Sequence, residues 1–291
     1  MKILCLCEQS PLTSGLIASL EQNYEVPLVL TPHYREVNSS IASKAKKLTI
    51  RKIGNYLYFR LLRTLFKRDR LHELFVGGSS ETTPTIQAEQ IHINSDEINS
   101  QKTVELIRKV EPDYLFVCGA PLLKKEIFDI PRFGTVNLHF GISPDYRGHH
   151  TLLFPYLEED YQKLGATLHF IDAGVDTGEI LAQIYPEVRG NDCLEGVESK
   201  IITLAQEILS GVFEETPIPR KQRIPSENKG RMIHFHDYGL VADFCCAIRY
   251  WKNRLFAPEK ILSKERIVHF SEKIIPISGY KDRTPLETVQ R

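Results

Sequence analysis

The stretch DYLFVCGAPLLKKEIFDIPRFGTVNLHFG, from Asp113 to Gly141, alternates between strand-like and helix-like segments. This alternation recurs through much of the chain. Two apolar runs, Asp113–Cys118 and Gly134–His139, are rich in the β-branched and aromatic residues that strands favour. A segment with helical character lies between them. We therefore predict two strands joined by a short helix.

The same alternation extends over about the first 180 residues. Strands alternating with helices favour an α/β fold, with a mostly parallel sheet that helices cover on both faces. Ligands then bind beyond the carboxyl ends of the strands. The other predicted strands are Lys2–Cys7, Val26–Thr31, Ile91–Ile93, Gly165–Asp172 and Glu179–Val188, and the other predicted helices are Ser14–Asn23, Ser100–Val110 and Leu194–Glu214.

The character of the chain changes after about residue 215. The run TPIPRKQRIPSENKGR, Thr216–Arg231, holds three prolines and five basic residues and predicts an irregular linker. We therefore expect one catalytic domain over residues 1–215, followed by a linker and a small C-terminal region over residues 216–291. Within that region Ala242–Leu255 has helical spacing.

Composition excludes several classes of protein. The 37 Lys and Arg balance the 37 Asp and Glu, which disfavours a nucleic-acid partner along the whole chain. No stretch approaches the roughly 18 apolar residues of a membrane-spanning helix, and the start MKILCLCEQSPL reads as a first strand rather than a signal peptide. The six cysteines lack the spacing of a metal site, so we expect no metal, buried free thiols and a cytoplasmic location.

A basic segment over residues 43–70 leaves several interpretations open. Its ten Lys and Arg residues lie between positions 44 and 70, interleaved with aromatic and aliphatic side chains. We favour a helix with one face on the sheet and a solvated basic face. Contact with phosphate or nucleic acid, and peripheral attachment to a membrane surface, are the alternatives.

Three polar motifs follow the strands. Asn137 and His139 project from the same side of a strand, where an amide and an imidazole can polarise a carbonyl. SPDYRGHH, Ser143–His150, is a polar turn, and FIDAGVDTGEILAQ, Phe170–Gln183, carries Asp172 and Asp176 in a glycine-bearing loop. Taken singly, each motif is equally compatible with a turn cap, a buried hydrogen bond or an acid that binds turn amides.

Taken together and in this order, the motifs resemble the folate-dependent formyltransferase family, most closely its sugar N-formyltransferases. The matching runs are Asn137-Leu138-His139, Ser143–Gly148 and Asp172–Gly178, and the resemblance is specific over about residues 85–190. It implies a Rossmann-like formyltransferase fold and an enzyme that transfers a formyl group to an amine. The family also includes glycinamide ribonucleotide formyltransferase and methionyl-tRNA formyltransferase.

The resemblance assigns roles to individual residues. Asn137 is expected to bind the formyl oxygen, His139 to supply a second donor and assist proton transfer, and Asp176 to orient His139 and help deprotonate the amine. It implies 10-formyltetrahydrofolate as co-substrate. The residues expected near its pterin are Gly119, Ala120, Pro121, Leu122, Leu123, Ile171, Asp172, Gly174 and Val175.

The acceptor is inferred from what surrounds these motifs. The short C-terminal region fits the β-barrel of the tRNA enzymes poorly, so the resemblance favours an amino deoxysugar carried on a nucleoside diphosphate, as in polysaccharide biosynthesis. Alternatives are a free amine, glycinamide ribonucleotide, methionyl-tRNA, hydrolysis of the donor, or a non-catalytic binding module. A homodimer is left open. Expected acceptor contacts are Ser10, Thr13, Ser14 and Gly15, which could also be an ordinary helix cap, with Ser143, Tyr146 and Arg147.

Overall fold

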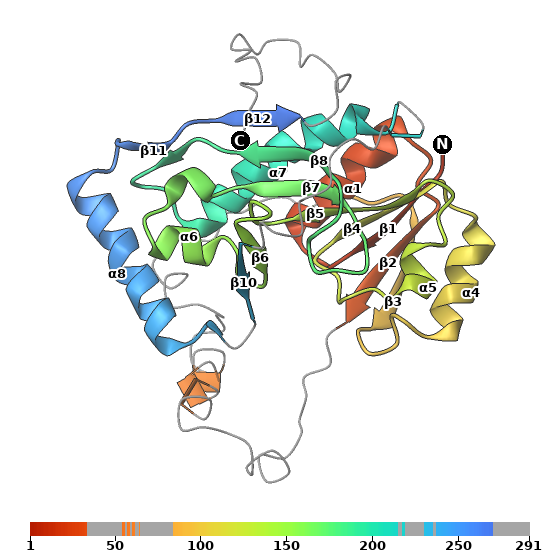
Figure 1. Ribbon diagram of the computed structural model, residues 1–291, viewed down its shortest axis with the longest axis horizontal. Coiled ribbons are helices and arrows are strands. Elements are labelled where there is room, and N and C mark those ends of the chain that lie inside the picture. The colour runs from red at the N-terminus through yellow and green to blue at the C-terminus, as the bar shows by residue number, and fades with distance from the viewer. Residues whose placement is uncertain are drawn as a thin grey trace.

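The computed structural model describes residues 1–33, 54–55, 57–58, 60–61, 64, 84–214, 217–218, 230–234 and 237–269. Most of the basic segment 43–70 and of the expected linker 216–231 lies outside these residues. The described residues form an eight-stranded sheet with the order β12-β8-β7-β5-β4-β1-β2-β3, flanked by helices (Figure 1).

Five neighbouring strands of this sheet run parallel. They are β1 (Ile3–Cys7), β2 (Leu28–His33), β3 (Glu89–Asn94), β4 (Tyr114–Cys118) and β5 (Gly134–His139). The expected mostly parallel sheet is therefore confirmed, with an antiparallel extension that the sequence did not predict. The extension consists of β7 (Ala166–Phe170), β8 (Ile180–Tyr185) and β12 (Arg266–His269).

Within the extension, β7 and β8 pair antiparallel because the connection between them is short. A parallel neighbour needs a crossover of a dozen or more residues, usually through a helix. Only the loop 171–179 separates β7 from β8, so the chain turns back directly. This loop carries the predicted aspartates, and the turn therefore places them beside the end of β5.

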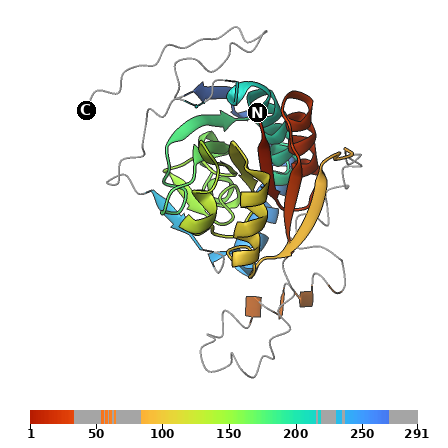
Figure 2. The same ribbon diagram turned by 90° about the vertical axis from the view of Figure 1, so that its right-hand side faces the viewer.

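Helices cover both faces of the sheet. On one face α1 (Pro11–Asn23) packs against α7 (Leu194–Val212), and Figure 2 shows the two side by side in red and teal. On the other face lie α4 (Gln101–Val110) and the short α5 (Lys125–Phe128). None of the described helices is long and apolar enough to cross a membrane.

The strands are apolar throughout because both of their faces are covered. In β1, alternate residues pack into the core beneath α1 and α7, while Leu4 and Leu6 pack with Val104 and Ile107 of α4. Three cysteines, Cys5, Cys7 and Cys118, are buried free thiols as expected. Burial raises the pKa of the Cys7 and Cys118 thiols well above the ordinary value.

Burial was the wrong prediction for two other cysteines. Cys193 is only partly buried, because its sulfur caps the start of α7 by accepting from the Gly196 N–H. Cys245 is exposed, because it lies on the outward side of α8 (Leu240–Phe256). The expected helix over Ala242–Leu255 is α8 itself.

The strands and the helix among the described residues beyond 215 pair or pack mainly with elements between residues 146 and 189. The strand β10 (Arg231–Ile233) pairs in parallel with β6 (Tyr146–Gly148), and α8 packs against α6 (Leu153–Leu157). Further along, β11 (Ile261–Ser263) pairs with β9 (Val188–Arg189), close to the short 3-10 turn Tyr161–Lys163. The division into two domains at residue 215 stays a prediction.

Replacing Leu16 by alanine should destabilise the whole domain. Leu16 has no solvent-exposed surface and lies in the core that α1 shares with α7, so the Leu16→Ala change should lower the free energy of unfolding by about 2–5 kcal/mol. Urea denaturation followed by circular dichroism measures this. Ile261→Ala, at a half-exposed strand position, is the matched control, and an equal loss in both variants would contradict the assigned core.

Candidate active site

The end of β5 carries the predicted amide and imidazole. Val136 and Leu138 pack into the core beneath α1 and α7. The alternation of a strand therefore turns Asn137 and His139 to the opposite face, as the sequence predicted. Asn137 is partly exposed and His139 is buried, and both lie at the carboxyl end of the strand.

Asp176, in the loop between β7 and β8, lies close to the end of β5 that carries Asn137 and His139. Its Oδ2 lies 3.7 Å from Nε2 of His139, and its Oδ1 lies 3.7 Å from Nε2 of His169. The Gly148 N–H donates to Oδ2 at 2.9 Å. Asp176 has a φ of 51°, a left-handed conformation that aspartate tolerates better than most residues. The three residues expected to be catalytic thus converge.

His169 is a member of this cluster that the sequence analysis missed. It lies on β7 directly opposite Asn137 in the antiparallel register. Its Nδ1 is 2.8 Å from the Phe170 carbonyl and its Nε2 is 3.2 Å from Nδ2 of Asn137. The Phe170 carbonyl fixes the hydrogen on Nδ1, so Nε2 accepts from the Asn137 amide and holds its orientation.

The electrostatics of the cluster follow from its burial. Burial lowers the pKa of His139, and the Asp176 carboxylate partly opposes that shift. Burial also acts to raise the pKa of Asp176, but the His139 and His169 rings and the Gly148 N–H outweigh it and hold that pKa well below the usual value. At neutral pH the site therefore contains a neutral imidazole beside a fixed negative charge.

His139 also provides the clearest sign of a ligand site. Its Nε2 is buried and has no hydrogen-bond partner among the described residues. Buried polar atoms in native proteins are almost always paired, and exceptions concentrate where a substrate binds. This atom and the Asn137 amide fit a ligand that offers a carbonyl oxygen and a proton.

Ser143 lies within a buried polar network behind the cluster. Its N–H donates to Thr167 Oγ1 at 3.0 Å, its carbonyl accepts from Gln183 Nε2 at 2.6 Å, and Thr167 in turn donates to the Gly141 carbonyl at 2.6 Å. The network ties the turn after β5 to β7 and β8. Ser143 is fully buried, so a contact with the acceptor stays a prediction.

Tyr146 and Arg147, on β6, are also turned inward. The Tyr146 hydroxyl donates to Glu158 at 2.9 Å and to Asp160 at 3.3 Å. Arg147 is only 6% exposed, and its Nη1 donates to the Val175 carbonyl at 3.3 Å, one residue before Asp176. Arg147 thus supports the Asp176 loop from behind, and its expected contact with an acceptor phosphate also stays a prediction.

The two loops expected to hold a pterin lie together. Ala120, Leu123 and Ile171 all pack against the apolar cluster on the α4 side of the sheet, which is the face that carries Asn137. Gly119 has a φ of 71°, and Leu122 is 71% exposed. Apolar side chains and open backbone beside the Asn137 amide fit the flat, polar-edged ring of a pterin.

Asp172 and Gly174 shape the second of these loops. Asp172 accepts from the Gly174 N–H at 2.9 Å and from the Thr177 hydroxyl at 2.7 Å. The interpretation of Asp172 as an acid that binds turn groups is therefore the one its contacts support. Asp176, by contrast, is directed toward the histidines.

Glu8 is a second carboxylate at this edge that the sequence analysis did not single out. Its backbone is fixed on both sides, since its N–H donates to the Cys118 carbonyl at 3.0 Å and its own carbonyl accepts from Thr13 Oγ1 at 2.6 Å. Its side chain lies over Gly119, where an added Cβ would come within 2.6 Å of the Glu8 carboxyl carbon. Glycine at 119 is what admits this carboxylate.

The start of α1 is closed by its own cap. Ser10 and Thr13 form a capping box, and Pro11 contributes no N–H to the first turn. Ser14 donates to the Ser10 carbonyl at 2.9 Å. These contacts match the alternative of an ordinary helix cap, and phosphate binding by Ser10, Thr13, Ser14 and Gly15 stays a prediction.

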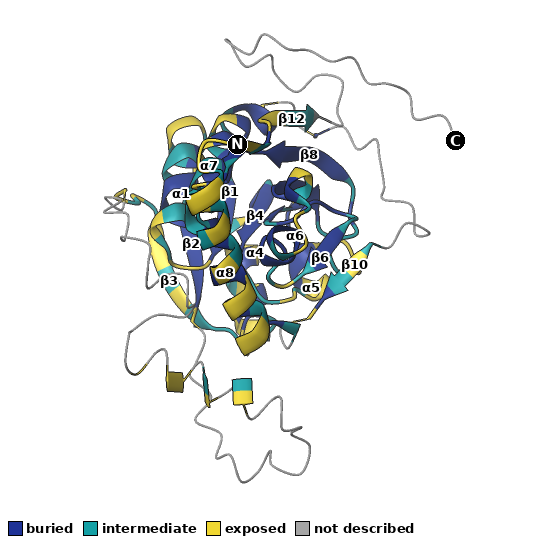
Figure 3. Cartoon of the chain, turned by 90° about the vertical axis from the view of Figure 1, so that its left-hand side faces the viewer, coloured by how far each residue is buried: buried dark blue, intermediate teal, exposed yellow. Residues whose placement is uncertain are grey.

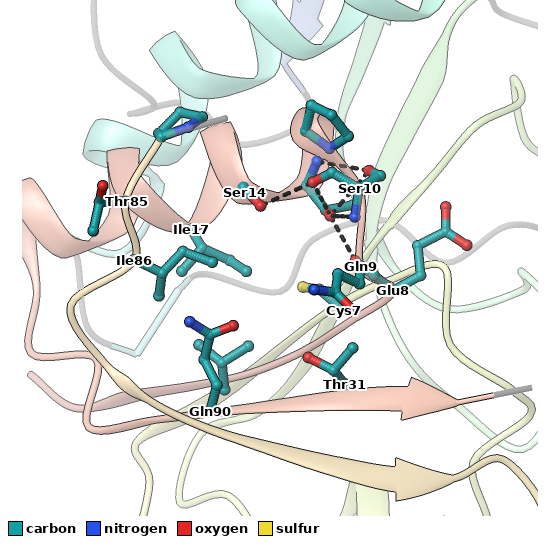
Figure 4. A pocket seen from close by; sticks show the side chains of 14 residues that line it. Cys7, Glu8, Gln9, Ser10, Ser14, Ile17, Thr31, Thr85, Ile86 and Gln90 are labelled. Atoms are coloured by element: carbon teal, nitrogen blue, oxygen red, sulfur yellow. Dashed lines mark hydrogen bonds between the residues drawn. The ribbon is translucent and has the colours of Figure 1, made fainter. Parts of the chain in front are cut away.

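A pocket of about 480 Å³ adjoins this helix start (Figure 4). It lies between α1 and the strands β2 and β3, and the close-up shows Ser14, Thr31, Thr85 and Gln90 around it. Its described lining contains one charged side chain, Glu8, and no Lys or Arg. The described residues also contain no cluster of His, Cys, Asp and Glu suited to a metal ion.

Known proteins resemble this chain in sequence and in fold. Residues 76–213 match the family model described as formyl transferase. Over 94% of this chain and 98% of the other, the fold is similar to a 4-N formyltransferase from Francisella tularensis, with 18% identity and a TM-score of 0.53. A sugar N-formyltransferase from Shewanella sp FDAARGOS_354 gives 16% identity and a TM-score of 0.52 over 95% and 99%.

The fold is therefore that of the formyltransferases. Over residues 76–213 the sequence is similar to the formyl transferase family model. Among curated sequences it is similar to the methionyl-tRNA formyltransferase of Methylacidiphilum infernorum (isolate V4), with 30% identity over 134 residues, or 46% of this chain and 42% of the relative. The match covers 42% of the length of the first two curated relatives and 54% of a third, so the chain spans about half of their length or less.

The coupling between Asp176 and His139 can be measured directly. In the wild-type protein the pKa of His139 should lie below 6.5, because burial disfavours the imidazolium. Asp176→Asn removes the charge that opposes this effect, so the pKa should fall further, and the ring should stay neutral to lower pH. Histidine-selective NMR titration measures both values, with the exposed Asp129→Asn as control. A rise in the pKa of His139 in the Asp176→Asn variant would contradict the assigned contact between Asp176 and His139.

Proposed function

We propose that this protein is an N-formyltransferase that uses 10-formyltetrahydrofolate to formylate an amine. The observation that carries the proposal is the convergence of Asn137, His139 and Asp176, with an unpaired Nε2 of His139 in the middle of the cluster. The match of residues 76–213 to the family supports it.

Each residue has a distinct task in this reaction. 10-Formyltetrahydrofolate supplies the formyl group as co-substrate. Asn137, whose amide His169 holds in place, donates a hydrogen bond to the formyl oxygen as negative charge develops there. A donor fixed before the reaction starts needs no reorganisation when the charge appears.

The directions of the pKa shifts suggest how the proton moves. His139 is neutral at working pH, so its Nε2 accepts the proton that the attacking amine loses as the new C–N bond forms. The resulting imidazolium hydrogen-bonds the oxyanion and then returns the proton to the folate nitrogen, as the bond between that nitrogen and the formyl carbon breaks and tetrahydrofolate leaves. Asp176 stays ionised and stabilises the imidazolium that forms 3.7 Å away. In this scheme Asp176 acts by its charge, and His139 carries the proton.

For the acceptor we propose an amino deoxysugar linked to a nucleoside diphosphate. The fold likeness to enzymes described as a 4-N and a sugar N-formyltransferase covers nearly all of both chains, whereas the curated methionyl-tRNA enzymes are matched over only about half of their length, 42% in one and 54% in another. The free cysteines of the described residues are in keeping with a cytoplasmic enzyme.

Methionyl-tRNA is the second candidate acceptor. It is favoured by one observation, the 30% identity to a methionyl-tRNA formyltransferase over 134 residues. A nucleotide sugar and a tRNA differ strongly in charge, so the two candidates differ in salt dependence as well as in product.

The acceptor can be identified by direct assay. The protein should release tetrahydrofolate and give a formylated product when 10-formyltetrahydrofolate is combined with dTDP- or UDP-linked 3-amino or 4-amino deoxysugars, and dTDP or UDP should compete with that acceptor. Mass spectrometry identifies the product, and charged methionyl-tRNA is assayed in parallel. Formylation of the tRNA alone would replace the sugar proposal. Release without a formylated product would indicate a hydrolase, and no release a binding module.

Loss of the oxyanion donor or of the fixed charge should act on turnover. Asn137→Ala and Asp176→Asn should each lower kcat on the order of 100- to 1,000-fold while the KM for the donor changes much less, because both groups act on charge that appears during the reaction. Steady-state kinetics with Asp129→Asn as control measures the effect. Near-normal kcat in either variant would overturn the assigned roles.

A further inference from the structure

Glu8 lies one residue past the end of β1, at the same edge of the sheet as the candidate site. The strands β1 and β4 are buried along their whole length and are dark blue in Figure 3, whereas Glu8 is exposed. An exposed glutamate is ionised at neutral pH. Backbone hydrogen bonds to Cys118 and Thr13 hold Glu8, so its charge is attached to a rigid part of the fold.

The Glu8 side chain lies on the face of the sheet that carries Asn137 and His139. Leu6, two residues earlier in the chain, packs on the α4 side, so the two-residue period of a strand turns Glu8 to the same side. Asn137 and His139 project to this side as well, because their neighbours in β5 pack beneath α1 and α7. Figure 4 shows the Glu8 side chain directed away from the cavity beside α1. Its charge therefore serves the side of β5 rather than the cavity.

The Glu8 side chain also reaches sideways toward β5. The strand β4 lies between β1 and β5 and pairs in parallel with both. The Glu8 carboxyl carbon lies over Gly119, only 2.6 Å from the position that an added Cβ would take, and thus covers the end of β4. Neighbouring strands are about 4.8 Å apart, so the carboxylate lies roughly 5 Å to the side of β5. An amino group fits between the two.

Two carboxylates therefore flank the end of β5. Asp176 is ionised and lies against His139 on the side of β7, and Glu8 lies on the side of β4. His139 is neutral, and its buried Nε2 has no hydrogen-bond partner among the described residues. The adjoining cavity adds no Lys or Arg in its described lining. A site with this charge attracts a ligand group that is positive and donates hydrogen bonds.

Of the two ligands in the proposed reaction, the acceptor carries such a group. An aliphatic amine is largely an ammonium ion at neutral pH, whereas 10-formyltetrahydrofolate is negative because of its glutamate carboxylates. We propose that Glu8 binds the ammonium group of the acceptor beside the formyl site, and thereby selects an amine over a hydroxyl at this position. The bound ammonium loses one proton to water, which reaches this exposed carboxylate, and the neutral amine then attacks the formyl carbon.

Binding of the donor is the other use that this carboxylate could have. A carboxylate can accept hydrogen bonds from the amino group and the ring N–H of a pterin. The negative charge of the donor disfavours a second carboxylate beside it, and a positive acceptor is favoured by the same charge. The two uses also differ in measurement, because loss of Glu8 weakens the acceptor in one case and the donor in the other.

Steady-state kinetics of Glu8→Gln, with the amine that the wild-type protein formylates, tests this inference, which rests on the proposed function. The change removes the charge at nearly constant size. The acceptor KM should rise roughly tenfold or more, because a hydrogen bond to a charged group is weakened, while kcat and the donor KM change much less. Glu8→Asp keeps the charge and should recover part of the loss. The matched control is Glu25→Gln, an exposed glutamate beside the start of β1, which should behave like the wild type.

Binding in the absence of donor separates recognition of the amine from a structural role of Glu8. Isothermal titration calorimetry compares the acceptor with its counterpart that carries a hydroxyl in place of the amine, beginning with dTDP-linked 4-amino-4,6-dideoxyglucose and dTDP-linked 6-deoxyglucose. The wild-type protein should bind the amine roughly tenfold more tightly. Glu8→Gln should bind both compounds alike, with its affinity for the hydroxyl compound unchanged from the wild type.

The outcomes distinguish this inference from the proposed function. An unchanged acceptor KM in Glu8→Gln, a rise in the donor KM instead, or an equal loss of affinity for both compounds overturns the role of Glu8 and leaves formyl transfer standing. A wild-type protein that binds the amine and the hydroxyl compound equally well also overturns it. A wild-type protein that formylates no amine overturns the proposed function, and this inference with it.

Discussion

The buried carboxylate of Asp176 is the charge around which the carboxyl edge of the sheet is arranged. A charge removed from water is stable only when it is paired or hydrogen-bonded. Here the Gly148 N–H of β6 donates a hydrogen bond to it, and the rings of His139 from β5 and His169 from β7 each lie 3.7 Å from one of its oxygens. The loop 171–179 can hold Asp176 in its left-handed conformation only while these strands keep their places.

The same arrangement separates two kinds of titratable group. His139 is moved toward neutrality by burial, and Asp176 is kept charged by its neighbours. Opposite environments for adjacent groups are a general way to divide acid–base roles within a site. The chain has no net charge, so this division depends on a few local contacts rather than on the field of the whole protein.

Much of the fold and the centre of the site could be predicted from the sequence. The two-residue period of a strand is enough to place Asn137 and His139 on one face, and alternating strands and helices predict the covered, mostly parallel sheet. His169 could not be found this way, because its role depends on its antiparallel register opposite Asn137. That register is a tertiary property, and an isolated histidine in an apolar strand does not reveal it.

Arg147 and Glu8 are two further residues whose surroundings could not be predicted from the sequence. The contact of Arg147 with the acceptor stays a prediction, but the sequence could not show that Arg147 is buried beside Val175 on a strand that pairs with β10. Glu8 looked like an ordinary residue after a strand, and only the close approach to Gly119 brings it to the edge of the site. In both cases the deciding neighbour is remote in sequence.

The pairing of β10 with β6 has a consequence for where the catalytic unit ends. Gly148 can have no side chain, because a Cβ there would lie 2.2 Å from the Ile233 carbonyl, and the His149 N–H donates to that same carbonyl at 2.9 Å. The Gly148 peptide, whose N–H binds Asp176, is therefore held in place by β10. This strand begins at Arg231, well past residue 213, where the match to the family model ends. The part of the chain that holds the candidate site together is therefore longer than the part that matches the family model, and exchanging the C-terminal region for that of another protein would also exchange part of the support of Asp176.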